Sequence, residues 1–147
     1  MSLNEWLKRG WLTSHKTSAG EITALFNVAD RDLTDSQAQG LSTDSQLSIA
    51  YNAALQMATA ALAASGYRAA REAHHYRIVQ SLTYTIGAKA DLVLQLDSFR
   101  KKRNISDYER AGTVSAQEAR EMFNLAETLR AMVTEWLKKN HPELLRD

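Results

Sequence analysis

The sequence of 147 residues contains no cysteine, and this absence excludes disulfide bonds and thiolate ligands for a metal. It contains a single proline, Pro142, so that almost the whole chain is free of this helix breaker. Long hydrophobic runs are also missing. No stretch approaches the roughly 20 apolar residues that cross a bilayer, and the first residues lack the basic and apolar regions of a signal peptide. We therefore expect a cytoplasmic protein that does not enter a membrane.

Neither sign of charge predominates, because 18 lysines and arginines stand against 17 aspartates and glutamates. The formal net charge of +1 thus indicates nothing about partners. A composition of 44% hydrophobic and 24% charged residues is typical of a soluble globular protein. A chain of this length forms one domain, here residues 1–147, which buries about two thirds of its unfolded surface.

Apolar residues recur at helical spacing through most of the sequence, which predicts an all-α fold. Three polar pairs are typical of helix starts, and Gly66 is expected to end an alanine-rich helix; the pairs are Ser18 with Glu21, Thr43 with Gln46, and Ser115 with Glu118. We predict an antiparallel up-and-down bundle of four main helices with a short N-terminal helix. The expected ranges are 3–12 for the short helix, then 19–33, 44–64, 76–110 with an interruption at Gly87, and 116–140.

One group of polar residues stands out near residue 100, because its members are separated by steps of three and four and so share one side of a helix; they are Arg100, Arg103, Asn104, Asp107 and Tyr108. Two guanidiniums, an amide, a carboxylate and a phenol cannot face an apolar core unpaired, since burial of unmatched charge costs several kcal/mol. We name these five residues the polar stripe and interpret it as a binding surface. Its arginines suit phosphate, which accepts forked hydrogen bonds.

A plainer interpretation of the polar stripe remains open. Residues 100–103 are four consecutive cations near a helix C-terminus, where positive charge is favourable, and a solvated or aspartate-paired face accounts for them without a ligand. Asp107 stands four residues after Arg103 and is placed to pair with it. The adjacent pair His74 and His75 does not predict a metal site, because neighbouring helical residues project about 100° apart and no acidic or cysteine cluster completes the ligands.

Several of these features together resemble the HEPN superfamily of helical bundles: the alanine-rich helix with residues 51–55, the turn at 66–68, the His74–His75 pair, and Arg103, Asn104 and Tyr108. The resemblance covers most of the chain and implies nucleotide binding or metal-independent RNA cleavage. The nuclease motif of that family is an arginine, a polar residue and, a few positions later, a histidine. Arg103 and Asn104 match it, and Tyr108 stands where the histidine is expected.

The substitution at Tyr108 bears on catalysis. Histidine, with a pKa near 6.5, can act as a base or an acid in RNA cleavage, whereas tyrosine, with a reference pKa of about 10, is mostly protonated at pH 7 and serves chiefly as a hydrogen-bond donor. We therefore predict a HEPN-like module that binds RNA, a nucleotide or a partner protein through the polar stripe without turnover. The alternative is a divergent endoribonuclease with Arg103, Asn104 and Tyr108 as catalytic residues.

The resemblance also implies partners. HEPN proteins commonly form homodimers, and many act beside a nucleotidyltransferase in toxin–antitoxin pairs, so a homodimer and a nucleotidyltransferase partner are expected on that ground. No cofactor and no metal are predicted.

Overall fold

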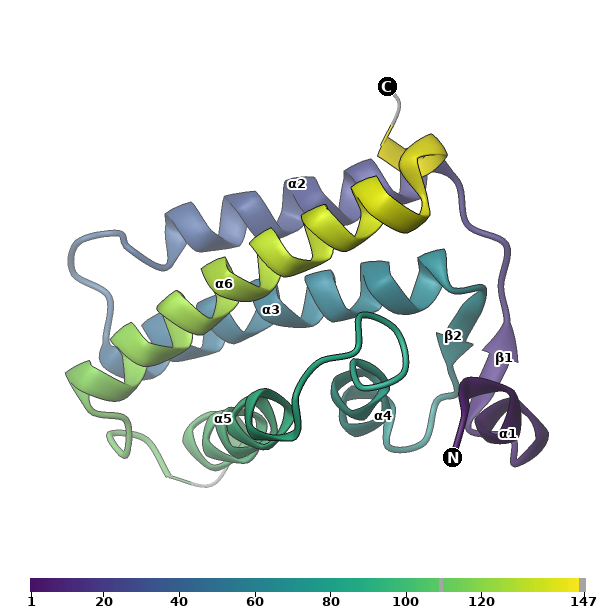
Figure 1. The fold of residues 1–147 in the computed structure, drawn as a ribbon. Helices are drawn as coiled ribbons and strands as arrows, with labels where there is room; N and C mark the ends of the chain where they lie inside the picture. Colours follow the sequence, from purple (N-terminus) through teal and green to yellow (C-terminus); the bar gives the residue numbers. More distant parts are fainter. Residues whose placement is uncertain (109, 146–147) are drawn as a thin grey trace.

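The computed structural model describes residues 1–108 and 110–145, and for Tyr108 it describes the backbone only. The described chain is mostly helical, which confirms the all-α class (Figure 1). Its elements in chain order are α1 (Leu3–Lys8), β1 (Leu12–Ser14), α2 (Ala19–Asp35), α3 (Thr43–Ala64), β2 (Tyr67–Ala69), α4 (His74–Ser81), α5 (Ala90–Tyr108), α6 (Ala116–Asn140) and the 3-10 turn η1 (Pro142–Leu145).

Helix α3 is the centre of the fold, and neighbours pack on it from several sides. Its buried residues follow one another around the whole helix, from Leu47 to Ala63, and many are alanines that allow close approach. By length and composition α3 would suit a membrane span, but 67% of its most apolar window is buried inside the fold, as in the core helix of a soluble protein.

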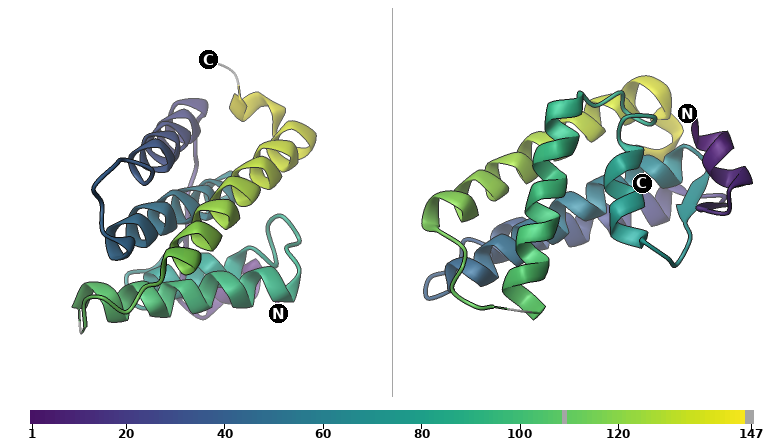
Figure 2. Two further views of the ribbon diagram at one scale, coloured as in Figure 1. Left: turned by 90° about the vertical axis from the view of Figure 1, so that its left-hand side faces the viewer. Right: turned by 90° about the horizontal axis from the view of Figure 1, so that it is seen from below.

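The long helices do not all follow an up-and-down order. In Figure 1, α2, α3 and α6 run lengthwise, whereas α4 and α5 are seen nearly end-on below them. Helices α2 and α3 run in opposite directions, but α6 runs in the same general direction as α3, because α5 crosses the layer before the chain returns (Figure 2). The predicted antiparallel bundle of four helices is therefore not confirmed in its topology.

Two of the three predicted helix starts are confirmed. The Ser18 hydroxyl accepts a hydrogen bond from the Glu21 backbone N–H (3.1 Å), and Ser115 with Glu118 forms a complete capping box. The predicted pair Thr43 with Gln46 is wrong. Ser42 caps α3 by accepting from the backbone N–H three positions later, and the Thr43 hydroxyl instead donates to the Val114 carbonyl (2.6 Å).

Two short strands were not predicted from the sequence. The first helix ends at Lys8 instead of continuing to residue 12, and β1 then pairs antiparallel with β2, so that Thr13 lies opposite Arg68. Beyond α3, Gly66 adopts a φ of +100°, the left-handed conformation expected at a helix end. The interruption predicted at Gly87 is wider than expected, because α4 ends at Ser81 and α5 begins at Ala90.

Candidate functional site

The arginines of the polar stripe are held by carboxylates of their own helix. Arg100 Nε donates to Asp97 Oδ1 at 2.7 Å, and Arg103 Nε lies 3.1 Å from Asp107 Oδ2, which also accepts from the Ser48 hydroxyl of α3 (3.1 Å). Each arginine exposes 18% of its side chain. The aspartate-paired face that the sequence left open is therefore present. Any anionic ligand must compete with Asp107 for Arg103.

Arg103 also contacts a buried tyrosine of the central helix. Its Cζ lies 5.5 Å from the ring centroid of Tyr51, a cation–π distance. The Tyr51 side chain is fully buried, and its hydroxyl has no hydrogen-bond partner within the described part of the chain. The Nε of Arg103 is likewise buried without one, because its contact with Asp107 lacks hydrogen-bond geometry. Two buried donors of neighbouring side chains thus have no hydrogen-bond acceptor among the described residues, which destabilises a fold by about 1–3 kcal/mol per group.

The first turn of α4 borders the same place. The His75 ring lies 6.5 Å from the Tyr51 ring, and the Tyr76 ring lies 5.4 Å from Arg100 Cζ. This helix starts abruptly, because Ala73 adopts a left-handed φ of +51° and no side chain caps the first N–H groups. Such a helix start carries a partial positive charge that favours anions. We name Tyr51, His75, Arg100 and Arg103 the α3–α5 site.

Burial and positive charge set the proton affinities at this site. Burial raises the pKa of the Tyr51 hydroxyl to about 12, although the nearby Arg100 and Arg103 oppose the rise. Burial also lowers the pKa of His75, and the charge of Arg103 lowers it further, with smaller contributions from His74 and Arg100. At neutral pH, Tyr51 is therefore a hydrogen-bond donor, and His75 is held more strongly in its neutral form than a free histidine.

Sequence reasoning found part of this site. The structure brings Arg100, Arg103 and Asp107 to one region, and Asn104 follows them half-buried on α5. The side chain of Tyr108 and the neighbouring residue 109 lie outside the described residues. Tyr51 and His75 were not predicted, because they come from other helices. Tyr51 gives one signal in retrospect, as a phenol in the middle of an alanine-rich apolar face.

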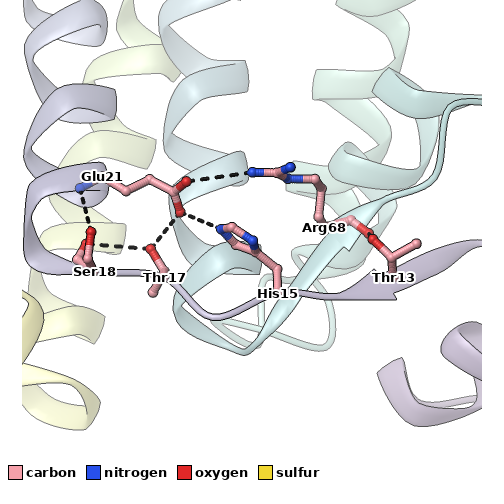
Figure 3. Close-up of polar contacts among 6 residues, drawn as sticks. All are labelled: Thr13, His15, Thr17, Ser18, Glu21 and Arg68. Carbon is pink, nitrogen blue, oxygen red and sulfur yellow. Dashed lines mark hydrogen bonds and ion pairs between the residues drawn. The ribbon is translucent and has the colours of Figure 1, made fainter.

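A second polar cluster lies at the start of α2 and is internally satisfied (Figure 3). Glu21 accepts from the Thr17 hydroxyl (2.6 Å), lies 2.7 Å from His15 Nε2 and pairs with Arg68 of β2 at 3.7 Å. These contacts, the Thr17 hydrogen bond first, lower the pKa of the Glu21 carboxyl. The cluster joins α2 to the β1–β2 sheet. A cavity of about 170 Å³ beside it is lined by His15, Tyr67 and His74.

The two adjacent histidines lie with ring centroids 5.5 Å apart. Among residues 1–108 and 110–145, no group of three or more histidine, aspartate or glutamate side chains is arranged to hold a metal ion. No protein-family model matches the chain, and no curated protein matches it in sequence.

Proposed function

We propose that this protein is a HEPN-like module that binds RNA or a nucleotide, and that the α3–α5 site holds one phosphate group. The observation that carries the proposal is a pair of buried donors, Tyr51 Oη and Arg103 Nε, that have no hydrogen-bond acceptor among the residues that the structure describes. A phosphate oxygen would accept from both, and the uncapped start of α4 would favour its charge.

Phosphate reaches Arg103 by replacing Asp107 as its partner. The exchange is favourable for a terminal phosphate, because it offers more charge and more acceptor oxygens than one carboxylate, and because Asp107 retains the Ser48 hydroxyl as a donor. Arg100 stays paired with the buried Asp97 and contributes positive charge from the turn of α5 that precedes Arg103.

The test measures binding of AMP and of a uridine trimer by the wild type and by the Arg100→Ala/Arg103→Ala variant. We expect the affinity to fall at least about tenfold in the variant, since each charge-assisted hydrogen bond contributes roughly 1.5–3 kcal/mol. Arg130→Ala is the control, because it breaks an arginine–aspartate ion pair away from the site, between Arg130 of α6 and Asp30 of α2. Equal affinity in the wild type and the double variant would remove the site from the proposal.

A divergent metal-independent endoribonuclease is the second candidate, and the position of His75 favours it. His75 does not stand at the histidine position of the motif, which Tyr108 occupies. Its neutral imidazole close to Arg103 would nevertheless supply the base that tyrosine lacks. His75 would take the 2′-hydroxyl proton while the 2′-oxygen bonds to phosphorus. Arg103 would stabilise the added charge, and Asn104 would orient the phosphate. The P–O5′ bond then breaks, and the leaving oxygen takes up a proton.

Cleavage is tested with single-stranded and structured RNAs in the presence of a chelator. The enzyme hypothesis predicts products that end in a 2′,3′-cyclic phosphate and disappear in both His75→Gln and Arg103→Ala. If binding occurs without any such product, the protein is a binding module only.

We further infer from the resemblance that the protein forms a homodimer and acts beside a nucleotidyltransferase. A dimer would double the number of α3–α5 sites. Sedimentation of the wild type at micromolar concentration tests this, and a monomer would contradict it.

A further inference from the structure

A row of alternating cations and aromatic rings extends from the α3–α5 site toward the N-terminus. Arg100 Cζ lies 5.4 Å from the Tyr76 ring, and Arg77 Cζ lies 5.4 Å from the same ring and 3.6 Å from the Trp11 ring. Arg9 Cζ follows at 5.1 Å from Trp11. We name these five residues the cation–aromatic track. They come from three separate parts of the chain: the α1–β1 connection, α4 and α5.

The elements that carry the track lie in a row on one face of the molecule. The right-hand view of Figure 2 shows α5, α4 and α1 one after another on the side facing the viewer. Tyr76 exposes 37% of its surface, Arg9 is exposed, and Trp11 and Arg77 are half-buried. The row is therefore accessible to a ligand at Arg9 and at Tyr76, beside the mostly buried Arg100.

The two arginines of the track farthest from the α3–α5 site, Arg9 and Arg77, are not paired with carboxylates of the described chain. Within the described part of the chain, the guanidiniums of Arg9 and Arg77 lie against rings and form no ion pair. A guanidinium stacked on a ring still presents its N–H groups at the edge, where they can donate to a phosphate. The buried Trp6 packs against Trp11 in an edge-to-face arrangement, with ring centroids 5.9 Å apart, and so fixes its orientation.

We propose that the cation–aromatic track binds single-stranded RNA that continues from the phosphate held at the α3–α5 site. Rings that alternate with cations suit a chain in which flat bases alternate with phosphates, because bases stack on rings and phosphates pair with guanidiniums. Duplex RNA fits less well, since its bases are already stacked on one another. This inference rests on the proposed function and adds the class of ligand and its direction across the surface.

The test separates the track from the site by the length of the RNA. Binding of a labelled uridine trimer and a labelled uridine dodecamer is measured for wild type, Arg9→Gln, Arg77→Gln and Trp11→Leu. We expect each track variant to weaken the dodecamer about five- to tenfold and to leave the trimer unchanged. Trp11→Leu acts through the loss of one stacked base, and the arginine variants act through the loss of a charge-assisted hydrogen bond to phosphate. The dependence of dodecamer affinity on salt should also become shallower, by about 0.7 in logarithmic slope for each arginine removed.

Two substitutions on α6 serve as controls. Arg120→Gln removes an exposed cation, and Trp136→Leu removes a half-buried indole, both away from the track. Loss of both trimer and dodecamer binding in Arg103→Ala, with wild-type behaviour in the controls, completes the expected pattern. Because Trp11→Leu risks disturbing β1, Arg9→Gln provides the same test at an exposed side chain.

Three outcomes would overturn the proposal. One is wild-type dodecamer affinity in all three track variants. Another is an equal loss of trimer and dodecamer binding, which would make the track part of the phosphate site alone. The third is displacement of the dodecamer by a polyglutamate peptide at equal charge concentration, which would assign the surface to an acidic protein. Failure of the proposed function differs from all of these, because trimer binding would then be insensitive to Arg103→Ala.

Discussion

Arg103 of α5 lies over the ring of Tyr51 of α3, with its Cζ 5.5 Å from the ring centroid. The contact joins two crossing helices at a place where the tyrosine is fully buried and the arginine mostly so. A cation–π pair of this kind contributes up to about 2 kcal/mol when it is desolvated. It leaves the Tyr51 hydroxyl without a hydrogen-bond partner in the described chain. Stability and ligand binding therefore make different demands on the same side chain.

The first prediction concerns Tyr51→Phe. The variant keeps the ring but removes a buried hydroxyl that has no partner in the described part of the chain, so the free energy of unfolding at pH 7 should stay the same or rise by up to about 1 kcal/mol. AMP affinity should fall about tenfold through loss of the donor. Urea denaturation and nucleotide titration measure the two effects. A loss of stability greater than about 1 kcal/mol would mean that the hydroxyl is bonded in the free protein.

The same variant has a signature at alkaline pH. Tyr51 has its pKa raised to about 12 in the folded protein, against an ordinary value of 10.0, so the unfolded chain loses this proton first. Wild-type stability should therefore decline as the pH rises above 10, and this decline should be smaller in Tyr51→Phe. The difference between the two proteins isolates Tyr51 from the other tyrosines.

The second prediction concerns Asp107→Asn. This change removes the carboxylate that competes for Arg103 and keeps an acceptor for Ser48, so affinity for AMP should increase about tenfold. Stability should change by less than about 1 kcal/mol, because the ion pair is partly exposed. Asp30→Asn, which breaks the pair with Arg130, is the control and should leave affinity unaltered. Weaker binding in Asp107→Asn would indicate that Asp107 positions Arg103 for the ligand.

The third prediction follows from the lowered pKa of His75. In the unfolded chain this histidine takes up a proton near pH 6.5, whereas the folded protein binds it only at lower pH, so stability should fall as the pH drops below 6.5 and level off past the folded pKa. His75→Gln should reduce that fall, and His74→Gln should reduce it less, because His74 makes only a smaller contribution to the lowered pKa of His75. In Arg103→Ala, the pKa of His75 measured by NMR should move up toward 6.5, since a neighbouring positive charge is gone.

The fourth prediction uses the left-handed Ala73. An alanine at a φ of +51° is less favourable than glycine there, so Ala73→Gly should raise the free energy of unfolding by about 0.5–1 kcal/mol. Ala131→Gly makes the same chemical change at an exposed position inside α6 and should lower it by about 1 kcal/mol. Thermal denaturation of the two variants gives opposite signs if the backbone at Ala73 is strained. Destabilisation by both would contradict this.

Residue patterns in the sequence predicted those features of the fold that depend on contacts between residues three or four positions apart. Helix starts at Ser18 and Ser115 follow from hydrogen bonds that span three residues, and the pairing of Arg103 with Asp107 follows from one helical turn. The crossing of α5 and the β1–β2 sheet did not follow, because each depends on packing between distant segments. A strand of three residues carries too little alternation to be recognised.

The candidate site divides in the same way. Its α5 residues were found because their spacing places them on one side of a helix. Tyr51 and His75 come close to them only when α3, α4 and α5 pack together, and the spacing of residues in the sequence does not predict that packing. Tyr51 packs in the core, and the position of Arg103 over its ring gives it a second role in the proposed site.

The small β1–β2 sheet has a consequence for the order of folding. It pairs Thr13 with Arg68, which stand 55 positions apart, so its formation closes a long loop at an entropic cost on the order of 3 kcal/mol. The three residue pairs of the sheet offset little of this entropic cost unless α2 and α3 are already packed. We expect Arg9 and Trp11 to reach their places late in folding and to be among the first to leave in native-state hydrogen exchange. RNA held along the track would slow that opening.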